Sequence, residues 1–445
     1  MELYKGDKVW LQLGSKKLKE RIEPQSGIRQ GCTLSATLFK LITYRIIKEF
    51  NKVSKGYVTD KLNVNALFFA DDGMLVNDTI SEAENAINQM QRIASEYGLK
   101  INRDKSNAMI FNTKQKMDQV GGIKVVEEMK YLGITINNGR DIFKNHKENK
   151  IKLAETLSNI TYSVISRSTN RLLIGKTYWK SIVLPAVLYG SNVVEYNEKE
   201  QERLQVIQNQ VCRRILNAPK WATNSATRGE IGMSTMSSRI IKSRLNYVNN
   251  RRKEGNELIK TVMNELEENE GRWKTFTRKQ CDKINIEQKK AQGMGKQEIR
   301  KATEDKDTEK WKEEMSKKKT LRYYRSNKTN IKQDEEYDNT RQSDIWFRIK
   351  TNCLYLGDRM TDNKTCKQCQ NELEDLPHFL LHCEKLKEPR NKSIHLQRPM
   401  KESEAQTISE FLFDNLELET KKSVVENLWT QRKLLLKQQD ADQHS

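Results

Sequence analysis

The feature that most constrains this chain is a pair of adjacent aspartates at the end of an apolar run. Residues 66–75 read ALFFADDGML, so Asp71 and Asp72 follow an aromatic and aliphatic segment and precede a glycine. This pattern predicts a strand, a tight turn at residues 71–73 and a second short strand at residues 74–77. Two like charges at the tip of such a hairpin are unfavourable unless something neutralises them.

A divalent cation would neutralise the two carboxylates directly. Mg²⁺ prefers hard oxygen ligands and commonly holds the phosphates of a nucleotide. In a two-metal site one ion activates an attacking hydroxyl while the other stabilises the leaving group. The alternative is an ordinary hairpin turn, because Asp and Gly dominate such turns for conformational reasons. The dipeptide alone favours the ordinary turn, and its aromatic, apolar lead-in favours the metal site.

The chain before the aspartate pair predicts a hairpin followed by a helix. Residues 8–23 alternate between apolar and polar positions around a turn at Gly14. Residues 34–45 then place leucines and isoleucine at helical spacing, with Thr33 or Ser35 as the candidate helix cap.

The chain after the pair continues the mixture of helix and strand. A capping box at residues 81–84 predicts the start of a second helix, which ends at Gly98. Residues 107–111 and 131–136 read as further strands. Residues 1–136 are therefore expected to have an α+β fold.

The bulk composition bounds the partners and the cellular compartment. The chain has 445 residues, of which 31% are charged, and its formal net charge is +20. Such a surplus points to a polyanion, most simply nucleic acid, although a solvated lysine-rich surface is the alternative. Seven cysteines and a charged N-terminus indicate a reducing compartment, nuclear or cytoplasmic, and not secretion. The longest apolar run, residues 182–188, is too short to span a membrane and contains Pro185.

Beyond the first region the pattern becomes helical. Residues 141–260 carry apolar residues at helical spacing. Residues 264–340 are highly charged with few aliphatics, which predicts either a solvated helical arm or a partly disordered one. Residues 341–390 return to a mixed composition around a cysteine cluster, and residues 391–445 are expected to form a helical tail.

The cysteine cluster has the spacing of a metal site. Cys366 and Cys369 are separated by two residues, His378 follows after eight more and Cys383 after another four. Three thiolates and one imidazole complete a tetrahedral Zn²⁺ site, which indicates a structural role. His382 is a rival ligand because it precedes the last cysteine, and unligated cysteines in a reducing compartment are the alternative to zinc.

Four motifs, taken in order, resemble the palm motifs of a reverse transcriptase. Their sequences are most similar to those of the non-LTR (LINE-type) retrotransposon family. They are GIRQGCTLSATLF, FFADDGML, GLKINRDKSNAMIF and KYLGITI. The resemblance implies a partial palm, an all-α thumb and helical region, and a small C-terminal zinc knuckle. It also implies an RNA-directed DNA polymerase that uses Mg²⁺ and deoxynucleoside triphosphates, with an RNA template and a DNA primer or target. A group II intron maturase has related motifs, but the spacing of the cysteines and histidine and the sequence FADD, rather than YADD, favour the LINE type.

By this resemblance, residues of the palm motifs take the family's roles one by one. Asp71 is the firm metal ligand with Asp72 in support, and Lys105 is a proton donor to pyrophosphate unless it is simply a surface lysine. For the three residues of the primer grip, the alternative is that they simply belong to the core. The implied residues are, for catalysis, Asp71, Asp72 and Lys105; for nucleotide and template binding, Gly27, Arg29, Gln30 and Gly31; and for the primer grip, Tyr131, Leu132 and Gly133.

The family's third catalytic aspartate has no counterpart in this sequence. Asp7 is the only aspartate before Arg29, and it lacks a preceding strand and lies too close to the loop. We therefore expect a chain that begins midway through the palm and that polymerises DNA poorly or not at all by itself.

Two classes of function remain open at this stage. One is the polymerase, and the other is a non-catalytic nucleic-acid-binding remnant that keeps the palm as a scaffold. In the helical region, Arg213, Arg214 and Lys220 beside Trp221 favour contact with a nucleic-acid strand. The oligomeric state, the copied RNA and the insertion site are not encoded in any pattern of the sequence.

Overall fold

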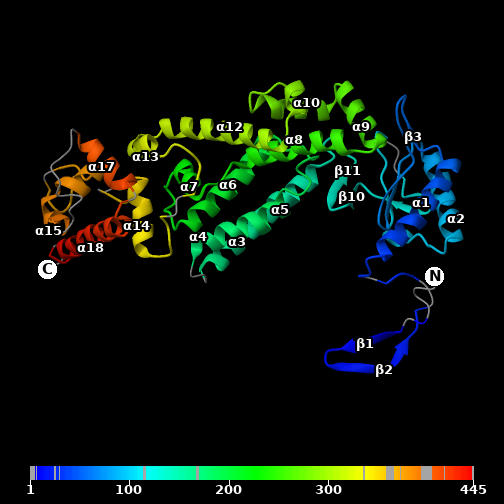
Figure 1. The fold of residues 1–445 in the computed structure, drawn as a ribbon, viewed down its shortest axis with the longest axis horizontal. Coiled ribbons are helices and arrows are strands. Elements are labelled where there is room, and N and C mark those ends of the chain that lie inside the picture. The colour runs from blue at the N-terminus through cyan, green and yellow to red at the C-terminus, as the bar shows by residue number, and fades with distance from the viewer. Residues whose placement is uncertain are drawn as a thin grey trace. The chain divides into compact units, whose positions relative to one another are not determined.

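The chain folds into two compact units, and each is described by itself. One comprises Met1–Asn145 and Asn256–Glu265, and the other comprises His146–Gly255 and Leu266–Ser445 (Figure 1). The computed structural model describes residues 6, 8–24, 27–29, 31–113, 117–166, 170–333, 336–356, 365–370, 372–391, 403–414 and 416–442.

The first unit mixes short strands with two long helices, so the predicted mixture of α and β is confirmed. Among its described residues, the strands form four two-stranded antiparallel hairpins and one three-stranded sheet in the order β7-β9-β8, in which β7 and β9 are parallel. The elements are β1 (Val9–Leu13), β2 (Lys16–Ile22), α1 (Ser35–Val53), β3 (Tyr57–Val58), β4 (Asn63–Val64), β5 (Ala66–Phe69), β6 (Asp72–Leu75), α2 (Ile80–Glu96), the 3₁₀ turn η2 (Arg103–Lys105), β7 (Asn107–Ala108), β8 (Gln119–Val120), β9 (Ile123–Val125), β10 (Glu128–Tyr131) and β11 (Ile134–Asn137), with part of α9 (Glu257–Glu268).

Helices α1 and α2 pack on the β5–β6 hairpin and hold it in place. Phe50 of α1 is fully buried, and Met90 of α2 is nearly so. Phe68 of β5 and Leu75 of β6 pack against this cluster from the hairpin side. The apolar lead-in to the aspartates therefore anchors the hairpin in a core, as the sequence pattern predicts.

The two predicted helix caps of this unit were wrong. Helix α2 is capped by Thr79, whose side chain accepts a hydrogen bond from the Glu82 amide at 3.2 Å. Thr79 and Glu82 have the same spacing as the predicted box, two residues earlier, and Glu84 instead accepts a bond from the Gly121 amide. Helix α1 begins after Leu34 with no side-chain cap.

The second unit is helical apart from an isolated bridge between Thr365 and Leu373, within the residues described. Its elements are α3 (Lys144–Ser166), α4 (Arg171–Tyr178), the π-turn η3 (Trp179–Val183), α5 (Leu184–Val187), α6 (Glu198–Ile215), α7 (Asn224–Ile231), α8 (Met236–Glu254), α10 (Arg272–Asp282), α11 (Gln288–Gly293), α12 (Lys296–Ser316), η4 (Lys319–Leu321), α13 (Arg322–Asn327), α14 (Arg341–Lys350), the π-turn η5 (His378–His382), η6 (Glu384–Leu386), α15 (Lys387–Asn391), α17 (Glu404–Phe413) and α18 (Leu418–Asp442).

The predicted charged arm at residues 264–340 is neither solvated nor isolated. Helix α12 runs beside α8 (Figure 1), and its Ile299 and Trp311 are fully buried. The Trp311 indole donates a hydrogen bond to the Ser225 carbonyl at 2.7 Å. The buried stripe recurs every four residues, but two of its members are the polar Thr303 and Asp307. A count of aliphatic residues therefore missed it.

Candidate active site and candidate metal centre

The aspartate pair lies at the tip of the β5–β6 hairpin. Phe69 pairs with Asp72 across the strands, so the turn consists of Ala70 and Asp71 and begins one residue earlier than predicted. Ala70 adopts a φ of +54°, a conformation that side chains other than glycine rarely take. The predicted turn residue Gly73 lies instead in β6, opposite Phe68, where an added Cβ would lie 2.8 Å from Phe68 Cε1.

Both carboxylates are open to a ligand. Asp71 and Asp72 are exposed, and neighbouring Phe69 is 66% exposed. No third carboxylate, histidine or cysteine joins them in a possible metal site among the described residues. Asp7 lies outside those residues. The hairpin can thus present two metal ligands, and it lacks the third that the sequence comparison with palm motifs calls for.

The turn at residues 132–133 lies in a second hairpin near the pair. The predicted single strand over residues 131–136 was wrong, because Tyr131 pairs with Ile134 across a two-residue turn. Leu132 and Gly133 have φ values of +46° and +79°, as a tight hairpin turn requires. Burial raises the pKa of Tyr131, and the charge of Asp72 raises it further. The structure therefore brings Tyr131 within electrostatic range of Asp72.

Lys105 lies in η2, directly before β7. Its side chain is exposed, and its amide donates to Asn102 Oδ1 at 3.2 Å. In the described part of the chain no ion pair joins Lys105 to Asp71 or Asp72. Strand β7 covers only Asn107–Ala108 of the predicted strand at 107–111.

The glycine loop precedes α1. Gly27 and Gly31 have φ values of +99° and +86°, and nothing lies within 4 Å of a Cβ built at either position. The glycines are thus needed for their backbone conformation. Arg29 between them is exposed, and Gln30 lies outside the described residues.

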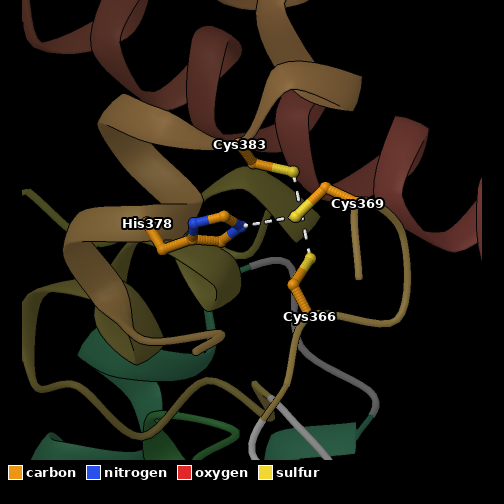
Figure 2. Close-up of side chains that lie close together, drawn as sticks. All are labelled: Cys366, Cys369, His378 and Cys383. Atoms are coloured by element: carbon orange, nitrogen blue, oxygen red, sulfur yellow. Dashed lines mark hydrogen bonds between the residues drawn. The ribbon is translucent and has the colours of Figure 1, made fainter. Parts of the chain in front are cut away.

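The three cysteines and the histidine of the C-terminal cluster converge, and Figure 2 shows their side chains pointing toward one another. Cys366 Sγ lies 3.9 Å from Cys383 Sγ, and Cys369 Sγ lies 3.4 Å from His378 Nε2. All four candidate ligand atoms lie within 4.8 Å of one another.

These distances fit tetrahedral Zn²⁺. Zinc–sulfur and zinc–nitrogen distances of about 2.3 and 2.0 Å place two sulfur ligands about 3.8 Å apart, and sulfur and nitrogen about 3.5 Å apart. The hydrogen bond between the Cys366 and Cys383 sulfurs lowers the pKa of Cys383 and raises that of Cys366. A hydrogen bond of this kind already favours a thiolate in the cluster, the form that binds metal.

The neighbouring side chains separate the two histidines. His378 Nδ1 lies 2.9 Å from Glu372 Oε2, which leaves Nε2 facing Cys369. His382, the rival ligand, directs Nε2 to Glu404 Oε1 at 2.7 Å. Its ring is thus engaged outside the cluster.

Two buried arginines hold the segment around the cluster. Arg432 of α18 binds Glu374 through Nε at 2.5 Å and Nη2 at 2.6 Å. Arg390 donates to the carbonyls of Leu380 and Cys383 at 3.0 and 2.7 Å. The sequence analysis missed these residues and Glu372. Glu372 could have been predicted, because it is a carboxylate between two of the proposed ligands, Cys369 and His378. No local sequence pattern indicated the two arginines.

The arginine pair of α6 does not form an open patch. Arg213 Nε donates to the Ala222 carbonyl at 3.2 Å, and Arg214 Nη1 donates to the Ser158 carbonyl at 2.7 Å. Both guanidinium groups therefore join chain segments. Trp221 and Lys220 remain exposed.

Comparison with known proteins identifies the first region. Residues 4–136 match the family described as reverse transcriptase (RNA-dependent DNA polymerase). A transposon-derived protein of Caenorhabditis elegans is 26% identical over 167 residues, which are 35% of this chain and 57% of that protein. The Pol polyprotein of the type-1 retrotransposable element R2 of Nasonia vitripennis is 25% identical over 191 residues, 39% of this chain and 18% of that protein. In both cases the match covers less than two thirds of the relative.

The chain thus carries a reverse-transcriptase region, followed by a helical remainder. The similarity to the R2 polyprotein is consistent with the resemblance of the palm motifs to the non-LTR, LINE-type retrotransposons. Among the described residues, no helix combines the length and the apolar character needed to cross a membrane.

Proposed function

We propose that this chain contributes the palm of an RNA-directed DNA polymerase, which copies RNA into DNA by Mg²⁺-dependent nucleotidyl transfer. The observation that carries the proposal is the exposed aspartate pair at a strained turn, beside Tyr131, in a region that matches the reverse transcriptases. Residues 1–136 are the partial palm in this proposal, and residues 141–260 contain the thumb.

Each residue takes a role that its position allows. Asp71 and Asp72 hold Mg²⁺, which supplies charge stabilisation to the phosphates of the incoming nucleotide. The turn at Leu132 and Gly133 supports the primer end. The loop of Gly27, Arg29, Gln30 and Gly31 lies against nucleotide and template, and Lys105 donates a proton to pyrophosphate. Lys105 must approach the aspartates in the complex, because the free structure does not join them.

Two carboxylates do not fix two metal ions, so we propose that the chain alone extends primers poorly. The test is primer extension with purified protein, Mg²⁺ and deoxynucleotides, comparing the unaltered chain with Asp71→Ala and with Asp60→Ala. Asp60 is an exposed acid in the turn between β3 and β4 and serves as the matched control. Robust extension that Asp71→Ala abolishes and Asp60→Ala preserves would show that the chain is an active polymerase and refute the idea of low activity.

The second candidate function is a non-catalytic nucleic-acid-binding protein that keeps the palm as a scaffold. The lack of a third carboxylate beside Asp71 and Asp72 among the described residues favours it. Failure to bind Mn²⁺ at the pair, together with retained binding of nucleic acid, would select this function over the first.

We also propose a structural Zn²⁺ in a knuckle within residues 341–390, held by Cys366, Cys369, His378 and Cys383. The tetrahedral spacing of their donor atoms supports it. Elemental analysis of purified protein should find about one equivalent of zinc. Less than about half an equivalent would count against the site.

A further inference from the structure

We propose that α14, α18 and the loop carrying Trp221 form a surface that binds a single strand of RNA or DNA. The surface belongs to the second compact unit and is distinct from the aspartate pair in the first. It rests on the proposed function only in that both have nucleic acid as their partner.

Two rows of basic side chains lie on adjoining helices. Helices α14 and α18 pack against each other. Arg341 and Arg348 are seven residues apart on α14, and Lys433 and Lys437 are four apart on α18, so each pair shares one face of its helix. Burial lowers the pKa of Lys433, and the positive charges of Arg341, Arg348 and Lys437 lower it further. The four cations therefore form one cluster.

Few carboxylates neutralise this cluster. Asp344 lies between the two arginines on α14, but it binds Arg171 and the Asn217 side chain. Glu426 lies 3.8 Å from Arg341. In the part of the chain that the structure describes, Arg348, Lys433 and Lys437 form no ion pair. A polyanion would relieve the repulsion among them.

An exposed aromatic pair continues the surface. Trp221 is 44% exposed and Tyr355 is 38% exposed, and their ring centroids lie 6.0 Å apart. The Trp221 indole donates to the Cys353 carbonyl at 2.9 Å. The amide of Cys353 in turn donates to the Arg348 carbonyl at 2.8 Å, so the aromatic rings follow directly from the basic end of α14.

A hydrogen bond ties the two parts together. Arg348 Nη2 donates to the Asn217 carbonyl at 3.1 Å, and Asn217 opens the loop that leads to exposed Lys220 and Trp221. Basic groups that follow a phosphate backbone, next to aromatic rings on which bases stack, are the recurring design of single-strand binding. In a duplex the base faces are already stacked on one another. The exposed aromatic pair therefore favours binding of a single strand over binding of a duplex.

The experiment measures binding of the full chain to a labelled oligouridine, the matching oligodeoxythymidine and a duplex of equal length, by fluorescence anisotropy over a range of salt. Tyr355→Ala should weaken single-strand binding by about fivefold or more, with little effect on the duplex. Lys433→Gln with Lys437→Gln should weaken it and reduce the slope of log affinity against log salt by about 1.4, the value for two lost phosphate contacts.

Matched controls separate this surface from general charge. Lys301→Gln with Lys312→Gln removes the same charge from exposed positions on α12 and should leave affinity and salt slope close to those of the unaltered chain. Asp71→Ala should also keep the Tyr355-dependent binding, so failure of the polymerase proposal is distinguishable from failure of this one. Thermal melting confirms that each variant is folded.

Two results would overturn the inference. If the lysine and tyrosine variants bind like the α12 control, the surface does not bind nucleic acid. If the lysine variant loses duplex and single strand alike while Tyr355→Ala loses neither, the partner is a duplex. A photocrosslink between a 4-thiouridine oligonucleotide and the unaltered chain provides an independent readout, and its adduct should map to the peptide containing Trp221 or Tyr355.

Discussion

Replacing Glu372 with glutamine should weaken zinc binding without removing a ligand. Glu372 Oε2 lies 2.9 Å from His378 Nδ1, and the Glu372 side chain is 62% exposed, so the fold does not depend on burying it. A carboxylate on Nδ1 holds the proton there and leaves Nε2 free to bind metal, which also makes the imidazole a better donor.

The expected loss of zinc affinity follows from the contact between Glu372 and His378. Loss of such an outer partner lowers metal affinity by about 10–100-fold, which is about 1.4–2.8 kcal/mol. Glutamine keeps an acceptor oxygen but loses the charge, and water around this exposed carboxylate screens part of its effect. We therefore expect about a tenfold loss, at the lower end of the range.

The assay is a zinc titration in competition with a chromophoric chelator, and Glu404→Gln is its matched control. Glu404 Oε1 bonds His382 Nε2 at 2.7 Å and is similarly exposed, at 43%, but its histidine is not a ligand in our assignment. Glu404→Gln should therefore leave zinc affinity unchanged. Equal affinity for the unaltered chain and Glu372→Gln would refute the role of Glu372. A loss confined to Glu404→Gln would make His382 the ligand.

Three further predictions concern stability and are measured by urea unfolding of the full chain. Gly73→Ala should destabilise the first unit by about 1–3 kcal/mol through overpacking, because the added methyl would lie 2.8 Å from the Phe68 ring; an unchanged midpoint would show that the ring moves freely. Lys350→Met should cost about 3 kcal/mol, the lower end of the range for a broken buried ion pair, since it removes the cation 3.4 Å from the fully buried Glu230 while Lys328 remains 3.8 Å from it; a stability equal to that of the unaltered chain would contradict this. Burial lowers the pKa of His146, so unfolding takes up a proton once the pH falls below about 6.5; stability should fall there, and His146→Asn should remove that part of the pH dependence.

The sequence predicted those parts of the fold that depend on close neighbours. The β5–β6 hairpin and the end of α2 at Gly98 both follow from local spacing. Boundaries were less certain, since the spacing of a capping box occurs twice within residues 79–84 and only packing decides between the two. Glu84 is used for a contact with Gly121, far along the chain.

What the sequence could not predict depends on segments far apart along the chain. The cluster at Cys366 and Cys383 is nearly local, so its spacing was enough to bring the donors together. By contrast, Arg213 and Arg214 read as a nucleic-acid patch, and the structure directs both to carbonyl groups of other segments. The basic surface on α14 and α18 was missed for the same reason, because its two rows are about ninety residues apart in sequence and meet only through helix packing.

The Ala70 backbone offers a way to choose between the two interpretations of the aspartate pair. Ala70 holds a φ of +54°, where glycine would be unstrained, so Ala70→Gly relieves strain of about 1 kcal/mol and adds about as much entropy to the unfolded chain. Stability should therefore change little in either interpretation. If the strained turn serves to fix Asp71 and Asp72 for a metal, the looser glycine turn should weaken Mn²⁺ binding, followed by electron paramagnetic resonance. Unchanged Mn²⁺ binding would mean that the strained turn has no role in the metal site, and no Mn²⁺ binding in either protein would mean that the pair is an ordinary hairpin turn.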